Sequence, residues 1–320
     1  MVMTEHSSTT TRGLSRRLFL RQLAVAGAGG VLAACSGSSS SSSQASADPA
    51  ASTPSDPGAA AIRAVAPDAT ADLAVVAATY EQLIDQPSPF VFGLFTLEQE
   101  PIDDASAELY AVAATGEPLG PWPATPSGAD VPPGGLYTAP VEFSSTGLHE
   151  MVVVTSDGRA GVAAVEVRDA ASSVLPAPGE QAQAVATPTT TAPLGYDRVC
   201  TRSPEPCGMH EVSLDEALAG DAPVVLLFAT PAFCQTAVCG PTVDVVEQVR
   251  RGFDDVTFIH CEIFADAGET LGDPVVAWDL PTEPWMFVID TGGTIVRRAD
   301  GPLLVVPDEV RSLITDGVAA

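Results

Sequence analysis

The chain has 320 residues, a length that suits one large domain or two ordinary ones, and 46% of them are hydrophobic, enough for a buried core. Its 41 acidic and 14 basic residues leave a formal net charge of -27. Nucleic acid and anionic lipid headgroups are therefore poor partners for the folded part, and we expect no nucleic-acid partner.

The first 34 residues have the three parts of an export signal: a basic start, an apolar stretch and a small-residue cleavage point. The apolar stretch, 23–34, is too short to span a bilayer, which takes about 20 apolar residues. Residues 15–21 resemble the twin-arginine consensus, and residues 32–35 resemble a lipobox. This resemblance to exported lipoproteins implies that Cys35 becomes the first mature residue and carries a diacylglycerol. The lipid would anchor the chain on the extracytoplasmic face of the cell membrane.

Residues 35–60 are mostly Ser, Ala, Pro and Asp, a composition that predicts a disordered tether. Residues 61–172 contain short apolar stretches separated by Gly, Pro, Asp and Ser clusters, without a helical period. This pattern predicts a β-sandwich of immunoglobulin-like type, serving as a spacer or a binding platform. The predicted strands are 90–95, 107–112, 135–143, 150–155 and 161–167.

A Pro- and Thr-rich stretch, 173–195, predicts a linker to a C-terminal domain at 196–320. There the chain alternates between apolar strands and helical stretches, an order of β-α-β-α-β-β-α that predicts a mixed sheet with helices on both faces. The expected strands are 223–229, 256–264, one from residue 284 and one at 295–298, and the expected helices begin near 241 and 307.

Two cysteines, Cys234 and Cys239, lie on the expected turn between the first strand and the first long helix of this domain. A cysteine at a helix N-terminus gains from the helix dipole, which lowers the thiol pKa. By this reasoning Cys239, two residues before Pro241, is best placed to be a thiolate. The order of attack stays open, as does the alternative that the two form a permanent disulfide.

Strand, cysteine turn, helix, strand and then Glu283-Pro284 at the start of a late strand resemble the thioredoxin fold, over roughly residues 196–318. The resemblance implies that Pro284 is cis and faces the reactive cysteine. It also implies a thiol–disulfide oxidoreductase without a bound cofactor, in which Cys234 and Cys239 exchange with protein thiols or disulfides. The motif departs from the family, because four residues separate these cysteines instead of two.

Two rival resemblances remain. Residues 236–239, preceded by Pro231, are similar to the peroxiredoxin signature with the proline one residue too far away, which would make the protein a thiol peroxidase. A cysteine pair with a distant histidine, His210 or His260, is similar to the thioredoxin-fold copper chaperones, which would make the domain a Cu(I)-binding protein and not an enzyme. A degenerate domain kept only for binding is a further alternative.

We expect structural roles for the other three cysteines of this domain. Cys200 and Cys207 flank a Pro- and Arg-containing loop and are expected to form a structural disulfide, as the exported context permits. His210 could instead complete a metal site with them, but three ligands lack a fourth, and we expect no metal site. Cys261 is expected to be a buried, inert thiol, and His260 a packed residue on the opposite face of the same strand.

Overall fold

The computed structural model describes residues 57–319, apart from 85, 87, 104, 115–116, 128–133 and 235–237. The predicted export signal, Cys35 and most of the predicted tether lie outside the described residues. The last four tether residues, 57–60, belong to helix α2 (Pro57–Val65), which buries Ala61 and Ile62. None of the helices in the described part of the chain is long and apolar enough to cross a membrane.

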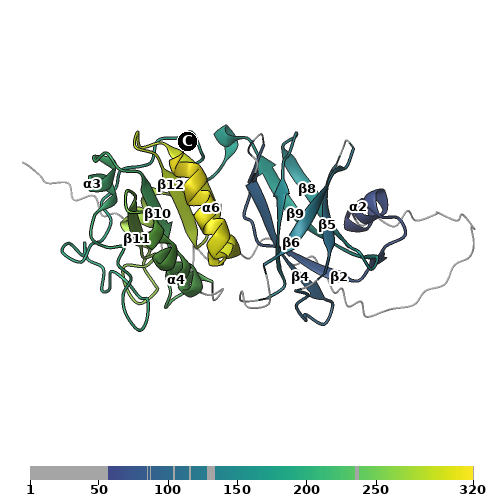
Figure 1. Ribbon diagram of the computed structural model, residues 1–320, viewed down its shortest axis with the longest axis horizontal. Coiled ribbons are helices and arrows are strands. Elements are labelled where there is room, and N and C mark those ends of the chain that lie inside the picture. Colours follow the sequence, from purple (N-terminus) through teal and green to yellow (C-terminus); the bar gives the residue numbers. More distant parts are fainter. Residues whose placement is uncertain are drawn as a thin grey trace, which may run out of the picture.

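The described residues form two domains that lie side by side, an N-terminal β domain and a mixed α/β domain with a smaller sheet (Figure 1). The strands of the β domain join in one sheet, in the order β1-β9-β8-β5-β6-β7-β4-β2, with β3 paired to β9. They are β1 (Thr70–Ala71), β2 (Leu73–Ala77), β3 (Gln82–Leu83), β4 (Ser88–Thr96), β5 (Ala107–Ala113), β6 (Leu119–Pro126), β7 (Leu136–Val141), β8 (Gly147–Thr155) and β9 (Arg159–Arg168).

Strand β6 lets this sheet fold into two layers. Its earlier residues pair with β5, and its last two, Thr125 and Pro126, pair with β7 in the other layer. Large side chains from both layers meet in one core, which includes Phe90, Phe92, Tyr137, Leu109 and Met151. Two layers around one core confirm the prediction of a β-sandwich.

The mixed α/β domain has a four-stranded sheet with the order β11-β10-β12-β13. Strands β10 and β11 are parallel, whereas β12 runs antiparallel to both of its neighbours, β10 and β13. The elements are α3 (Leu214–Leu218), β10 (Val224–Phe228), α4 (Cys239–Val249), β11 (Thr257–Cys261), α5 (Asp273–Ala277), β12 (Trp285–Ile289), β13 (Ile295–Asp300) and α6 (Pro307–Val318). Every residue of the central strands β10 and β12 is buried, as a strand covered on both faces requires.

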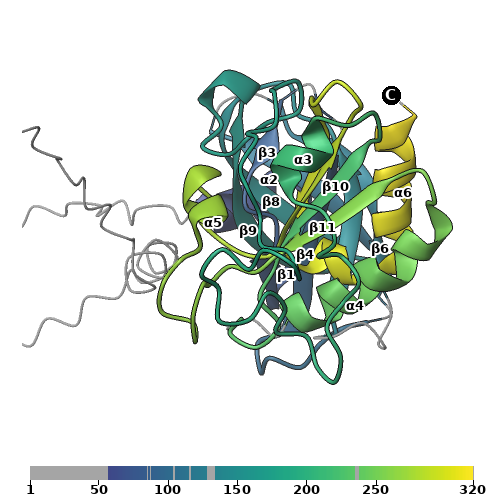
Figure 2. The same ribbon diagram turned by 90° about the vertical axis from the view of Figure 1, so that its left-hand side faces the viewer.

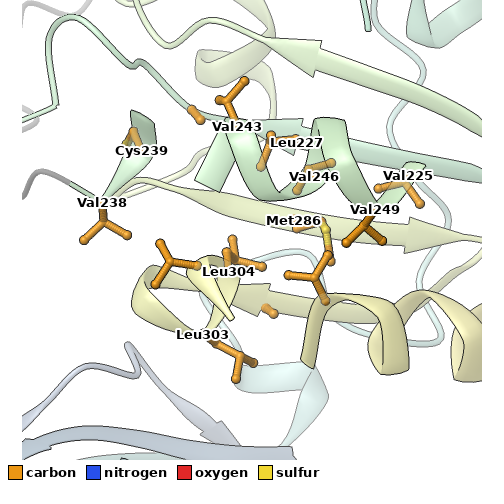
Figure 3. Close-up of a cluster of buried hydrophobic side chains, with 14 of the residues drawn as sticks. Val225, Leu227, Val238, Cys239, Val243, Val246, Val249, Met286, Leu303 and Leu304 are labelled. Atoms are coloured by element: carbon orange, nitrogen blue, oxygen red, sulfur yellow. The ribbon is translucent and has the colours of Figure 1, made fainter. Parts of the chain in front are cut away.

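Helices cover both faces of this sheet (Figure 2). On one face α4 and α6 pack against alternate strand residues such as Leu227 and Met286, with Val243 and Val246 from α4 among them (Figure 3). On the other face the alternate residues of the same strands meet α3, α5 and the ring of Trp278. The predicted order of strands and helices is therefore present in this domain.

The predicted linker, 173–195, connects the domains but is not a free spacer. Leu175 and Ala177 are buried, and backbone hydrogen bonds tie Gly179 N to Ile295 O and Ala182 N to Gly293 O, both at 2.8 Å. The small Ala and Thr side chains let this segment lie close against the edge of the sheet. Its composition thus predicts the absence of regular structure, but not that it is packed against the domain.

A buried carboxylate holds the two domains together. Glu81 of the β domain has a side chain that is 1% exposed and pairs with Arg298 of β13 at 2.5 Å and with Arg168 at 3.2 Å. Val91 and Leu136 of the β domain belong to the same apolar cluster as Leu303 of the α/β domain. A cavity of about 640 Å³ lies beside Glu81, between the domains, and neither Cys234 nor Cys239 lines it.

The same interface contains a titrating group, Asp300, whose carboxylate accepts a 3.0 Å hydrogen bond from Tyr80 N. Burial raises the pKa of Asp300 to about 7. An unfolded chain titrates this group near pH 4, so the stabilisation that Asp300 contributes is complete below that pH and is lost as pH rises through 7. The residue is not fully enclosed, and the remaining contact with solvent screens its charge. We therefore expect the free energy of unfolding to fall by only about 1 kcal/mol over this pH range. Urea unfolding at pH 5 and at pH 8 measures this difference in the free energy of unfolding, and D300N should abolish the part that Asp300 contributes. If the difference between the two pH values is the same in D300N, another group is responsible for it.

Candidate functional site

Two of the predicted site residues, Cys234 and Cys239, come together where β10 ends. The sulfur atoms of both cysteines and a carboxylate oxygen of Glu283 lie within 4.8 Å of one another. Cys234 is partly exposed, whereas Cys239 is completely buried. Residues 235–237 between them are outside the described residues, so the structure does not describe Thr236 of the peroxiredoxin-like motif.

The local sequence accounts for this placement. The apolar strand β10 places the turn at its carboxyl end, where the backbone N–H of Cys234 donates a 3.0 Å hydrogen bond to Thr230 O. Helix α4 begins at Cys239 and packs Val243 and Val246 against the sheet, which fixes the Cys239 thiol at the sheet surface (Figure 3). A buried helix face therefore holds the second sulfur of the pair in place.

The electrostatics differ from the expectation for Cys239. A hydrogen bond with Cys234, burial and the negative charge of Glu283 together raise the pKa of the Cys239 thiol well above its usual range. Burial and the nearby negative charge act against the helix dipole, which would lower the pKa of an exposed thiol at the same position. The thiolate form of Cys239 is thus disfavoured, and Cys234 is the more exposed of the two sulfurs.

The third predicted site residue, Pro284, follows Glu283, the carboxylate that lies close to this pair. The Glu283–Pro284 peptide bond is cis, as expected, and Pro284 is buried immediately before β12, the strand that pairs with β10. This loop brings Glu283 to the two sulfurs. Sequence reasoning missed Glu283, and its only signal was its position beside the proline.

A second cluster lies on the same face of the sheet. Cys200, Cys207, His210 and His260 are all buried, and one sulfur or ring nitrogen of each lies within 4.8 Å of the others. Cys207 Sγ is 3.2 Å from His210 Nε2 and 3.3 Å from His260 Nδ1. Cys200 Sγ is 3.7 Å from Cys207 Sγ and 3.8 Å from His260 Nδ1.

Both sulfurs in this cluster are free thiols in the structure. The disulfide expected between Cys200 and Cys207 is not formed here and stays a prediction for the oxidised chain. A hydrogen bond from Cys207, helped by the two histidines, lowers the pKa of the Cys200 thiol. The structure also brings His260 into the cluster from β11, although the sequence separates it by 50 residues from His210.

Cys261 confirms the expectation of a buried thiol. It lies on the opposite face of the sheet from the cluster, packed with Ile259 and Ile263, and burial raises its pKa. Its side chain contacts neither group of cysteines described above, so it serves as an internal control for thiol chemistry.

Comparisons with known proteins identify no family: no family model and no curated protein matches the chain. Among solved structures, the filamin domain of Lin-41 is 10% identical, with a TM-score of 0.24 over 31% of this chain and 94% of that chain. The ZirS C-terminal domain is 10% identical, with a TM-score of 0.20 over 43% and 87%. The superoxide reductase neelaredoxin from Ignicoccus hospitalis is 15% identical, with a TM-score of 0.20 over 33% and 90%. Scores this low carry no argument about fold or function.

Proposed function

We propose that the protein is a thiol–disulfide oxidoreductase with a thioredoxin-like C-terminal domain, and that Cys234 and Cys239 are its redox pair. The observation that carries the proposal is the pairing of a partly exposed sulfur with a buried one at the end of β10, beside the Glu283–Pro284 loop. An accessible attacking thiol and a buried resolving thiol are the two parts that disulfide exchange needs.

The reaction starts when the Cys234 thiolate attacks one sulfur of a substrate disulfide. That S–S bond breaks, the other substrate sulfur leaves as a thiolate that takes up a proton, and Cys234 is held in a mixed disulfide. Cys239 then loses its proton and attacks the Cys234 sulfur, which releases the second substrate thiol. The substrate has gained two electrons, and the protein holds a Cys234–Cys239 disulfide that a dithiol reductant must reduce. The same steps in reverse oxidise a substrate dithiol.

Glu283 fits the role of proton acceptor in the second step. Its carboxylate lies within 4.8 Å of both sulfurs, and its charge holds the proton on Cys239 in the resting pair. Once Cys234 is bound in a mixed disulfide its negative charge is gone, so Cys239 loses the partner that accepted its hydrogen bond. A nearby carboxylate can then take the proton as the new S–S bond forms.

The rival chemistries have less support at this pair. A peroxidase needs a reactive thiolate at Cys239, whereas that sulfur is buried and its pKa is raised. A copper site made by this pair together with His210 or His260 would need those histidines nearby, but they belong to the other cluster. Among the described residues, a carboxylate oxygen of Glu283 is the additional ligand atom close to this pair. A carboxylate is a poor ligand for Cu(I).

The membrane tether is part of the same proposal. A lipid on Cys35 and the Ser-rich tether would hold the redox domain on the extracytoplasmic face of the membrane, with the β domain as an immunoglobulin-like spacer between them. We expect C35S to move the protein from the membrane fraction to the soluble fraction and to abolish labelling by a fatty-acid analogue. Retention of both membrane association and label in C35S would contradict lipid attachment at this residue.

Turnover of a protein disulfide tests the proposed activity. The full chain should accelerate the reduction of insulin by dithiothreitol, followed by the turbidity of the released chains. A double variant, C234S with C239S, keeps both side-chain volumes nearly unchanged and supplies the background rate. Equal rates for the wild type and the double variant would contradict the proposal.

A further inference from the structure

We propose that Cys200, Cys207, His210 and His260 bind one Zn²⁺ ion in a closed Cys₂His₂ site, separate from the redox pair. The proposal does not depend on the proposed activity, because it rests on a different set of side chains. Two thiolates and two imidazoles are a common ligand set for structural zinc.

The separations between ligand atoms fit a tetrahedral ion. With Zn–S near 2.3 Å and Zn–N near 2.05 Å, a tetrahedron places two sulfurs about 3.8 Å apart and a sulfur and a nitrogen about 3.6 Å apart. The observed sulfur–sulfur distance is 3.7 Å, and the observed sulfur–nitrogen distances are 3.2, 3.3 and 3.8 Å. These four separations are close to the tetrahedral values, and the other two pairs of ligand atoms lie within 4.8 Å of each other, so small side-chain adjustments suffice for one ion to reach all four atoms.

Hydrogen bonds orient two of the ligands, His260 and Cys200, as a metal site requires. His260 Nε2 lies 3.1 Å from Ala229 O, a carbonyl that can only accept, so Nε2 carries a proton; in the neutral ring that binds a metal, the lone pair is then on Nδ1, the nitrogen that lies 3.3 Å from Cys207 Sγ. This is the outer-shell contact that fixes the tautomer of a metal-bound histidine. The backbone N–H of Cys207 donates to Cys200 Sγ at 3.4 Å, and this bond favours a thiolate at that sulfur.

A disulfide satisfies the same cluster less well. Joining Cys200 to Cys207 would remove both S–H donors and leave Nδ1 of a neutral His260, whose proton is on Nε2, facing sulfur with no proton between them. All four side chains are buried, so water does not replace those contacts as freely as it would at the surface. Zinc instead accepts a lone pair from each nitrogen and each thiolate, and binding releases the two thiol protons to solvent.

The site would stabilise the turn that carries Cys234. Thr201, the residue after Cys200, accepts a 3.1 Å hydrogen bond from Ala232 N in that turn, and His260 binds Ala229 O at the beginning of it. The backbone N–H of His260 also donates to Met209 O at 2.8 Å, which holds the ligand loop on β11. With four protein ligands no coordination position is left open, so we assign the ion a structural role.

Metal analysis of the full chain, purified without reductant, tests the site. We expect one zinc per chain by mass spectrometry of the metal, and loss of at least about 10-fold of it in C207S and in H260A. C261S, one residue from His260 on the opposite face, and the double variant C234S with C239S should both keep the zinc. Zinc lost with the redox pair but kept in C207S and H260A would place the ion at the other cluster and overturn the assignment.

Thiol mapping of the wild-type chain gives a test that needs no substitution. Cys200 and Cys207 should resist an alkylating reagent until a chelator removes the metal, and should then react without added reductant. A metal-free protein in which both become reactive only after reduction has the structural disulfide, and would overturn the proposal. Copper in place of zinc would overturn the choice of metal. Neither result depends on whether the redox pair turns over.

Discussion

Replacement of Cys234 by serine is expected to lower the rate of disulfide exchange by at least about 100-fold, because a serine hydroxyl stays protonated at neutral pH and is a weak nucleophile. We assign the attacking role to Cys234 because it is the partly exposed member of the pair, whereas Cys239 is completely buried. The measurement is insulin reduction by the full chain, with the zinc content followed in parallel to show that the variant is folded.

The matched variant is C239S, which keeps the attacking sulfur and removes the resolving one. We expect it to accumulate mixed disulfides with substrate proteins, visible as bands that disappear on reduction in non-reducing gels, whereas C234S should form none. If C234S accumulates the mixed disulfides and C239S does not, Cys239 is the attacking residue and the roles argued from burial are reversed.

Removal of the buried carboxylate between the domains is expected to cause the largest loss of stability. E81A would leave Arg298, whose side chain is 8% exposed, and Arg168 without their shared partner. Breaking a buried ion pair by removing one member costs about 3 to 5 kcal/mol, since the remaining charge is desolvated without its counter-charge. Arg298 keeps hydrogen bonds to Ser173, Leu175 and Pro176, so we expect the lower end of this range. Urea unfolding of the full chain, followed by far-UV circular dichroism, measures this loss.

An exposed ion pair in the same chain is the control for this effect. Asp72 and Arg159 are 3.0 Å apart with side chains 39% and 30% exposed, so D72N should cost less than about 1 kcal/mol. Similar losses in D72N and E81A would show that the Glu81 contacts contribute no more than a surface pair. A second unfolding transition in E81A would show that the two domains no longer unfold together.

Local patterns predicted the parts of the fold that depend on neighbouring residues. The apolar run 223–229 predicted a strand, which is β10, and the Gly, Pro, Asp and Ser clusters predicted breaks between strands, such as the turn before Arg159 that joins β8 to β9, with Gly158 at φ 83°. The placement of Pro284 before a late strand was predicted in the same way. In each case the signal lies within about ten residues of the feature.

Strand β6 was missed because its composition argues against a strand. The segment Leu119–Pro126 contains three prolines, which cannot donate to a β-ladder, and Gly120 has a φ of 99°. It is a strand because the neighbouring strands β5 and β7 supply hydrogen-bond partners for its remaining backbone N–H and C=O groups. That support comes from the assembled sheet and is invisible in the segment itself.

The cluster of Cys200, Cys207, His210 and His260 could not be predicted from the sequence as a set of four. Cys200, Cys207 and His210 lie within eleven residues, but the fourth ligand comes from β11, and no spacing rule connects it to the loop. Its place follows from the parallel pairing of β10 with β11 and from the docking of the loop on β11 through the Met209 carbonyl. The place of Glu283 could not be predicted from the sequence for the same reason, because the pairing of β12 with β10 brings it to the two cysteines.

The most direct test of the proposed function is an equilibrium redox titration of the full chain, with mass-spectrometric mapping of each thiol. We expect Cys234 and Cys239 to interconvert reversibly between dithiol and disulfide at potentials between about -120 and -270 mV, the range of known exchange proteins. A Cys234–Cys239 disulfide that stays intact below about -300 mV would be a structural bond, and would contradict the proposal that this pair exchanges with substrates.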